Sequence, residues 1–193
     1  MFPFYSDGLE MSIMAITEDY GKTWSFSNPL VGVANIQATL AIKNDGTIAA
    51  YMRDNGPPPQ LHYYSESKDR GKTWSDVTDS KVVNPGSGSD IVTLANGNWV
   101  LAYNDAEDGR YSLAVSLSDD EGKTWKYTRH IELDLNKDLD KRDKFSYPSI
   151  IQGNDGMIHV VYSLHKYNTL PHDDDTIKYI RFSEEWVKEG DKQ

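Results

Sequence analysis

The amino-acid sequence predicts an all-β protein built from repeated four-stranded antiparallel meanders. Three observations support this fold class. A turn with the pattern Ser/Thr-x-Asp-x-Gly-x-Thr-Trp occurs three times, about fifty residues apart. Asn-Gly and Asp-Gly pairs, which are typical of tight hairpins, alternate with these turns. Apolar segments of strand length flank both kinds of turn, whereas helical periodicity is weak along the chain.

The repeated Asp turn has a readable physical design. Its members are Thr17, Asp19, Gly21, Thr23 and Trp24 in the first copy, Ser67, Asp69, Gly71, Thr73 and Trp74 in the second, and Ser118, Asp120, Gly122, Thr124 and Trp125 in the third. Asp and Ser/Thr side chains bond backbone amides, and Gly supplies a positive φ. The Trp ring is expected to be buried beneath the turn. A metal or sugar site at each Asp is the alternative, but repetition in every unit favours a structural role.

A second kind of turn completes each repeat. Asn-Gly or Asp-Gly hairpins are expected within residues 43–48, 94–99 and 153–158. Each repeat then runs through strand, hairpin, strand, connection, strand, Asp turn and short outer strand, which is the pattern of a β-propeller blade. We expect the 193 residues to form a single domain with a half-blade at 9–28 and blades at about 31–78, 88–128 and 145–187.

These repeats amount to a partial propeller. About three and a half blades are fewer than the four to eight of a closed ring, so sheet edges and faces would be left open. The sequence is compatible with a homodimer that closes the propeller, with a truncated form of a longer protein, and with an open fan. The charged segment 132–144 precedes the last blade, and it is either a solvated excursion or a lid over a site.

Composition argues against several classes of function. The formal net charge is −10 and Lys and Arg form no cluster, so we expect no nucleic-acid partner. No apolar run is as long as a membrane span and the N-terminus lacks signal-peptide features, so we expect no membrane partner, and the compartment stays open. Cysteine is absent and the five His residues lack ligand spacing, so we expect no metal and no cofactor; "HDDD" at 172–175 is interpreted as a solvated loop.

The Asp turns resemble the Asp boxes of sialidases (neuraminidases), which are six-bladed propellers. The segments 51–57, 108–125 and 145–163 resemble blades of the bacterial BNR-repeat, predicted-neuraminidase branch. The resemblance covers essentially the whole chain and matches the C-terminal half of that family. It implies an exo-glycoside hydrolase that acts on a terminal acidic sugar, with a carbohydrate as ligand.

The resemblance also assigns roles to individual residues. Arg53 and Arg110 fit two arginines of the clamp that holds the carboxylate of the substrate, for which a planar guanidinium is suited because it forms two parallel hydrogen bonds. Tyr147 fits the tyrosine nucleophile, which replaces the usual carboxylate of glycosidases. In "YND", beside Arg110 in the same blade, Asn104 and Asp105 are expected to bond sugar hydroxyls.

The sequence departs from the family pattern at one catalytic position. The glutamate that activates the tyrosine should lie about eighteen residues before Arg53, and Asn35 stands there as a substrate-binding candidate that cannot act as a base. Asp54 and Asp90 are the alternative carboxylates. The third clamp arginine and the acid/base aspartate belong to the first blades of the family, to which no part of this sequence corresponds.

Three functions are compatible with these patterns. The first is the sialidase-like hydrolase, or its C-terminal half. The second is a non-catalytic propeller fragment that binds carbohydrate or protein, because Asp boxes also occur in propellers without this activity. The third is an exo-glycosidase of other specificity, such as an exo-arabinanase-like enzyme, for which the two arginines would have no carboxylate to bind.

Overall fold

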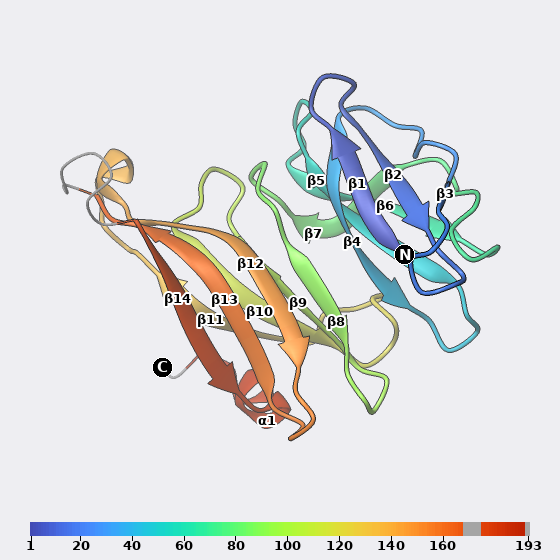
Figure 1. Ribbon diagram of the computed structural model, residues 1–193. Helices are drawn as coiled ribbons and strands as arrows, with labels where there is room; N and C mark the ends of the chain where they lie inside the picture. The colour runs from blue at the N-terminus through green and yellow to red at the C-terminus, as the bar shows by residue number, and fades with distance from the viewer. Residues whose placement is uncertain (168–174, 192–193) are drawn as a thin grey trace. The chain divides into compact units, whose positions relative to one another are not determined.

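The computed structural model describes residues 1–167 and 175–191, and it shows an all-β fold in that part of the chain (Figure 1). Its strands form four antiparallel sheets, in each of which strands adjacent in sequence are paired. The chain divides into two compact units, residues 1–86 and 87–193, with two sheets in each. The predicted all-β class and the meander order of the strands are therefore confirmed, while the blade boundaries stay a prediction.

Unit 1 contains one three-stranded and one four-stranded sheet. The first consists of β1 (Phe2–Ser6), β2 (Met11–Ile16) and β3 (Ser25–Phe26). The second consists of β4 (Asn35–Ile42), β5 (Ile48–Asp54), β6 (Leu61–Ser67) and β7 (Thr78–Val83). Strand β1 was not predicted from the sequence, and it pairs with β2 in a continuous antiparallel register. Met14 and Ile16 of β2 share a core with Ala50 and Met52 of β5.

Unit 2 contains one four-stranded and one three-stranded sheet. The first consists of β8 (Asp90–Thr93), β9 (Trp99–Tyr103), β10 (Ser112–Ser118) and β11 (Tyr127–Leu133). The second consists of β12 (Lys144–Gln152), β13 (Ile158–His165) and β14 (Thr176–Phe182). Every residue of β9 and β10 is buried. Val115 and Leu117 of β10 share a core with Ile158 and Val160 of β13.

Two short helices accompany the sheets of unit 2. The 3-10 helix η1 (Leu139–Lys141) lies in the charged segment before β12, and α1 (Glu184–Lys188) follows β14. Val187 of α1 is fully buried in the core of this unit. Within residues 1–167 and 175–191, no helix has the length and apolarity that crossing a membrane requires.

The three predicted Asn-Gly and Asp-Gly hairpins are confirmed. They connect β4 to β5, β8 to β9, and β12 to β13. Their glycines Gly46, Gly97 and Gly156 have φ values of 85°, 90° and 78°, in the left-handed region that a side chain disfavours. In the last hairpin the Asp155 carboxylate accepts a hydrogen bond from the N–H of Met157 at 3.0 Å, as an Asx turn requires.

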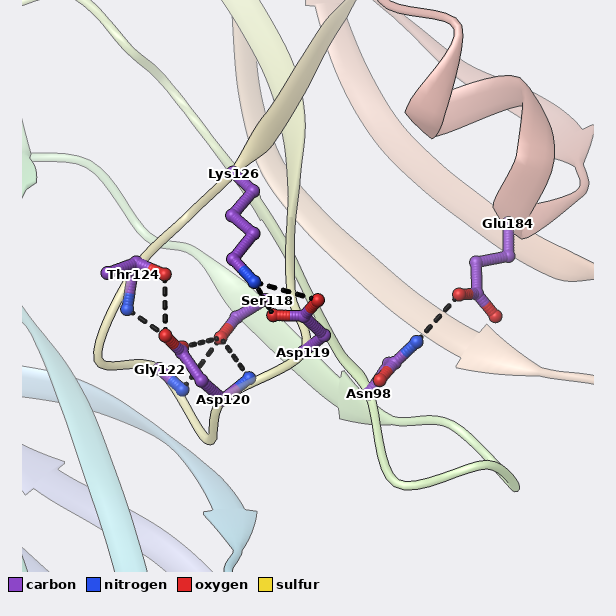
Figure 2. A network of polar contacts seen from close by, with 8 residues as sticks. All are labelled: Asn98, Ser118, Asp119, Asp120, Gly122, Thr124, Lys126 and Glu184. Atoms are coloured by element: carbon purple, nitrogen blue, oxygen red, sulfur yellow. Dashed lines mark hydrogen bonds and ion pairs between the residues drawn. The ribbon is translucent and has the colours of Figure 1, made fainter.

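In each Asp turn a single carboxylate organises the loop, and Figure 2 shows the third copy. Asp120 accepts hydrogen bonds from the N–H of Thr124 at 2.8 Å and from its hydroxyl at 2.6 Å, and Ser118 accepts one from the N–H of Gly122 at 2.9 Å. Asp19 and Asp69 bond their own threonines in the same way. These carboxylates therefore act inside the turns.

The tryptophans of the Asp turns differ from the expectation that their rings are buried. The Trp24 side chain is 45% exposed, and Trp74 is partly buried. The indole N–H of Trp24 donates to the carbonyl of Gly21 at 3.1 Å, and that of Trp74 donates to Gly71 at 3.0 Å. The ring covers its own turn and keeps its polar N–H satisfied at the surface. The tryptophan that is almost fully buried is Trp99 of β9.

The Asp120 carboxylate is expected to support folding only while it is charged. Hydrogen bonds from the side chain and backbone of Thr124 lower its pKa from 3.8 to about 2. A lowered pKa adds stability that is complete above the unfolded value and is lost as the pH falls through the folded value. Asp120→Asn should therefore lower the urea midpoint at pH 6, and its difference from wild type should shrink between about pH 4 and pH 2.

Asp119 offers a matched control for this measurement. It precedes Asp120 directly and pairs with Lys126 at the surface at 2.6 Å (Figure 2). Exposed ion pairs add little to stability, so Asp119→Asn should leave the urea midpoint nearly unchanged. Equal effects of the two substitutions would show that the contacts inside the turn do not determine its contribution to folding.

Candidate functional site

Arg110 and Tyr147 lie side by side in unit 2. The guanidinium carbon of Arg110 is 5.3 Å from the centroid of the Tyr147 ring, within the range of a cation–π contact. Nη1 of Arg110 donates to the hydroxyl of Ser146 at 3.3 Å. The backbone joins the same segments, because the N–H of Phe145 donates to the carbonyl of Arg110 at 2.7 Å. The structure thus brings together two residues to which the resemblance assigns a role.

A β-bulge in β12 presents the Tyr147 side chain. The pairing register between β12 and β13 shifts between Ser146 and Ser149, so an extra residue is accommodated there. Tyr147 has a φ of 52°, which is uncommon for an aromatic residue, and its side chain is 50% exposed. Such local strain persists only where the surrounding structure enforces it.

The Asn104 side chain holds the start of β12 through a hydrogen bond. It is fully buried, and its amide nitrogen donates to the carbonyl of Ser112 at 2.7 Å and to that of Phe145 at 3.0 Å. Its side-chain oxygen is buried and finds no hydrogen-bond partner among the residues that the structure describes. These contacts make Asn104 a residue that positions the strand carrying Tyr147.

Asp105 belongs to a carboxylate–imidazole–carboxylate chain. Nε2 of His130 lies 2.9 Å from Asp105, and Nδ1 of His130 lies 2.5 Å from Asp191. The hydroxyl of Ser112 also donates to Asp105. Although burial alone lowers the pKa of His130, the hydrogen bonds and charges of Asp191 and Asp105 outweigh it, so that the pKa is raised. Asp105 therefore ties the loop before Arg110 to β11 and to the segment after α1.

The charged segment before β12 forms one wall of a cavity at Arg110. The guanidinium of Arg142 stacks on Tyr111 at 3.9 Å, and the N–H of Asp134 donates to the carbonyl of Tyr111 at 2.9 Å. The cavity has a volume of about 380 Å³ and is lined by Asp108, Gly109, Arg110, Tyr111, Leu139, Asp140, Arg142, Asp143 and Lys144. Most of the segment is exposed, and both interpretations of it, the solvated excursion and the lid, stay predictions.

Arg53 has polar neighbours in unit 1. It donates from Nη1 to the side-chain oxygen of Gln37 and from Nη2 to that of Asn55, both at 3.3 Å. Gln37 in turn donates to the hydroxyl of Tyr5 at 3.2 Å. Nε of Arg53 is buried and has no hydrogen-bond partner within the described ranges. Arg53 is therefore held by neutral groups, which leave its positive charge uncompensated by these contacts.

Gln37 and Tyr147 occupy the same kind of position in two different sheets. Gln37 lies in β4, the first strand of its sheet, at a register shift between Ile36 and Thr39, and its φ is 51°. Tyr147 lies at the register shift of β12, again a first strand, with a φ of 52°. Each side chain contacts an arginine. The repeated sheet thus presents one residue beside a guanidinium in each unit.

The side chains of Asn35, Asp54 and Asp90 bond backbone groups of the protein. Asn35 is fully buried, and its amide bonds the N–H of Ser12 at 3.1 Å and the carbonyl of Gly32 at 3.1 Å. Asp54 accepts from the N–H of Gly56 at 2.8 Å, inside its own loop. Asp90 accepts from the N–H of Ile150 at 2.9 Å and so joins β8 to β12. Arg53 instead contacts the side chain of Gln37.

Gln37, Lys144 and Ser146 were not predicted from the sequence as site residues. Lys144 and Ser146 are two positions apart in β12, so the strand period places them on one face of the sheet. This spacing could be read from the sequence. Gln37 follows a register shift that breaks the alternation, which the residue pattern alone does not show. No group of three acidic or imidazole side chains in the described part of the chain is arranged to hold a metal ion, and residues 172–174 of "HDDD" lie outside that part.

The comparisons with known proteins agree on the type of domain. The family model described as a BNR repeat-like domain matches residues 2–160. No curated protein matches the sequence. Solved structures with similar folds include the Hadza microbial sialidase Hz136, at 18% identity and a TM-score of 0.70, over 92% of this chain and 33% of that one.

Two further similar structures are described as carbohydrate-active enzymes. The α-L-arabinofuranosidase Arb93A from Fusarium graminearum has 17% identity and a TM-score of 0.57, over 78% of this chain and 45% of that one. A polysaccharide lyase described as an ulvan lyase has 15% identity and a TM-score of 0.61, over 96% of this chain and 51% of that one. The chain spans a third to about half of these structures, and the partial-propeller fold class is confirmed.

The contact of His130 with two carboxylates is expected to make stability depend on pH. A raised pKa adds stability that is complete below the unfolded value of 6.5 and is lost as the pH rises through the folded value. The urea midpoint of wild type should therefore exceed that of His130→Gln most at about pH 5.5, and the difference should decline above pH 6.5. Asp191→Asn should weaken this dependence, and a difference that is constant from pH 5 to pH 9 would contradict it.

Proposed function

The chain belongs to the BNR repeat-like domain family, and from that premise we propose that it binds carbohydrate and acts as an exo-glycoside hydrolase on a terminal acidic sugar. The observation that best supports this proposal is the Arg110–Tyr147 pair, in which a guanidinium lies beside a half-exposed phenol. The pair stands at a strained bulge next to a cavity of about 380 Å³ that is lined in part by Arg110.

Arg110 is suited to the acidic group of such a sugar. A guanidinium binds a carboxylate through two parallel hydrogen bonds, so that it both neutralises the charge of the carboxylate and fixes its orientation. The overall charge of −10 repels anionic ligands at long range, so a local cationic group is needed to hold one. Arg142 and Lys144 line the same cavity, together with Asp108, Asp140 and Asp143. The contribution of Arg53 stays a prediction from the resemblance.

Tyr147 is the proposed nucleophile. Its phenolic oxygen would form a bond to the anomeric carbon while the bond from that carbon to the leaving oxygen breaks. The phenol proton passes to a base, and the leaving oxygen takes a proton from an acid. Water then cleaves the tyrosyl–sugar bond in a second displacement. A phenol is neutral near pH 7, so an anionic sugar approaches it without like-charge repulsion.

The similar structures support a carbohydrate ligand without defining it. One is described as a sialidase, one as an α-L-arabinofuranosidase in complex with an iminosugar inhibitor, and one as an ulvan lyase bound to a glucuronate–rhamnose sulfate unit. An exo-glycosidase of arabinanase type is thus a further proposal. The closing of the propeller by a second copy also stays a proposal.

A non-catalytic carbohydrate-binding fragment is the second candidate function. It is favoured by the amides at the positions where a base is needed, because Asn35 is buried in backbone contacts and Gln37 is the surface group beside Arg53. An amide does not accept a proton at physiological pH, but it does bond sugar hydroxyls. A binding fragment would keep the Arg110–Tyr147 pair as a platform for the ligand.

Replacement of Tyr147 by Phe tests the hydrolase directly. The change removes only the nucleophilic oxygen and keeps the ring beside Arg110. Turnover of a fluorogenic sialoside should fall roughly a thousandfold or more, because loss of a nucleophile removes the covalent path. Tyr179→Phe is a matched control on β14, where that phenol contacts His159 instead, and it should leave turnover unchanged. Absence of turnover in wild type with retained sialoside binding would favour the binding fragment.

Replacement of Arg110 by Lys tests the carboxylate contact. The charge is kept but the planar fork is lost, so KM for the fluorogenic sialoside should rise about tenfold. Arg181→Lys is the control, since Arg181 pairs with Asp155 at 2.8 Å in a surface ion pair. If Arg110→Lys and Arg181→Lys leave KM equally unaffected, Arg110 does not bind the acidic group.

A further inference from the structure

A second cavity, lined in part by Tyr147, lies in unit 2. Its volume is about 320 Å³, near the lower end of the range of small-ligand sites, which is about 300–1,000 Å³. It is lined by Lys144, Ser146, Tyr147, Ser163, Leu164, His165, Asp175, Thr176 and Ile177.

The register of the last sheet builds the cavity. Lys144 pairs with His165, and Ser146 pairs with Ser163, across β12 and β13. Ser163 also pairs with Ile177 of β14. Because side chains directly opposite each other share a face of the sheet, these five side chains converge on one surface.

The cavity combines apolar and polar groups in a pattern that suits a sugar ring. Ile177 is 70% exposed and Tyr147 is 50% exposed, so both offer apolar surface on which the C–H face of a sugar can pack. Ser146 and Ser163 carry hydroxyls that donate and accept hydrogen bonds. This composition is typical of a ligand site with few oriented polar groups.

Lys144 brings a positive charge to the cavity lining. It forms no ion pair with any residue in 1–167 or 175–191. Two carboxylates of the cavity linings have other contacts, since Asp175 pairs with His165 and Asp143 accepts from the N–H of Tyr167. Lys144 also lines the cavity that contains Arg110, so the two cavities share this ammonium group.

We propose that the second cavity is a subsite for the sugar next to the terminal one, and that Lys144 selects an anionic substituent on that sugar. The inference rests on the proposed function, because the terminal sugar is taken to bind at Arg110 and Tyr147. The substrate class is then a glycan in which two consecutive sugars are acidic. Lys144 is a specificity-determining residue and takes no part in bond cleavage.

Binding measurements with two probes test this subsite. Sialyllactose carries a neutral second sugar, whereas the second sugar of disialic acid carries a carboxylate. Both are titrated by calorimetry into Tyr147→Phe protein, which prevents turnover. Disialic acid should bind about five- to tenfold more tightly than sialyllactose, the increment of one partly exposed ion pair with hydrogen bonding.

Substitution of Lys144 assigns the preference to this residue. Lys144→Gln should abolish the preference for disialic acid, because the affinity for disialic acid falls about five- to tenfold more than that for sialyllactose, whereas Lys144→Arg should retain the preference. Lys123→Gln is the control, since it removes an exposed positive charge in the third Asp turn, outside both cavities.

The outcomes separate the subsite from the proposed function. A preference that survives Lys144→Gln, or equal losses for both probes, would overturn the subsite while leaving the terminal-sugar site in place. Equal affinities of the two probes for protein that retains Lys144 would also overturn the subsite and leave the terminal-sugar site in place. Failure of both probes to bind correctly folded protein would overturn the proposed function, and the subsite with it.

Discussion

The left-handed bulge in the first strand of a sheet is the constraint on which the candidate site depends. A regular strand alternates its side chains between two faces, and a residue with positive φ breaks that alternation. At Tyr147 the break turns an aromatic side chain outward beside Arg110. Buried neighbours hold the strained segment, above all Asn104, which bonds the carbonyl of Phe145. The core therefore maintains the surface geometry.

Most of the fold was predictable because its turns are local. Asp-Gly and Asn-Gly pairs fix hairpins through glycine φ values and short side-chain bonds, which need no information from distant residues. The strand β1 and the exposed Trp24 were not predicted, because pairing and burial depend on which surfaces meet. Family register pointed to Arg110 and Tyr147, which the structure brings together. It pointed to Asn35 instead of Gln37 because a bulge shifts the strand by an amount that residue counting does not reveal.

The distribution of charge explains how an acidic protein offers cationic surface. Many carboxylates are used internally, as in the Asp turns, the His130 contacts and the bond from Asp90 to β12. Two cations in this part of unit 2 contact uncharged groups instead. Arg110 contacts the Tyr147 ring and the Ser146 hydroxyl, and Arg142 stacks on Tyr111. A net charge of −10 therefore coexists with three cationic side chains, Arg110, Arg142 and Lys144, in the linings of two cavities that also contain carboxylates.

The contact between Asp191 and His130 has a practical consequence. The chain after α1 folds back onto β11, where Asp191 accepts the backbone N–H of His130 at 2.9 Å and also contacts its ring. Arg129 adds a bond to the carbonyl of Trp186 at 2.7 Å. Purification tags or reporter fusions attached directly behind these residues would pull on a strand whose imidazole also holds Asp105. A flexible spacer at that junction protects the loop that carries Arg110.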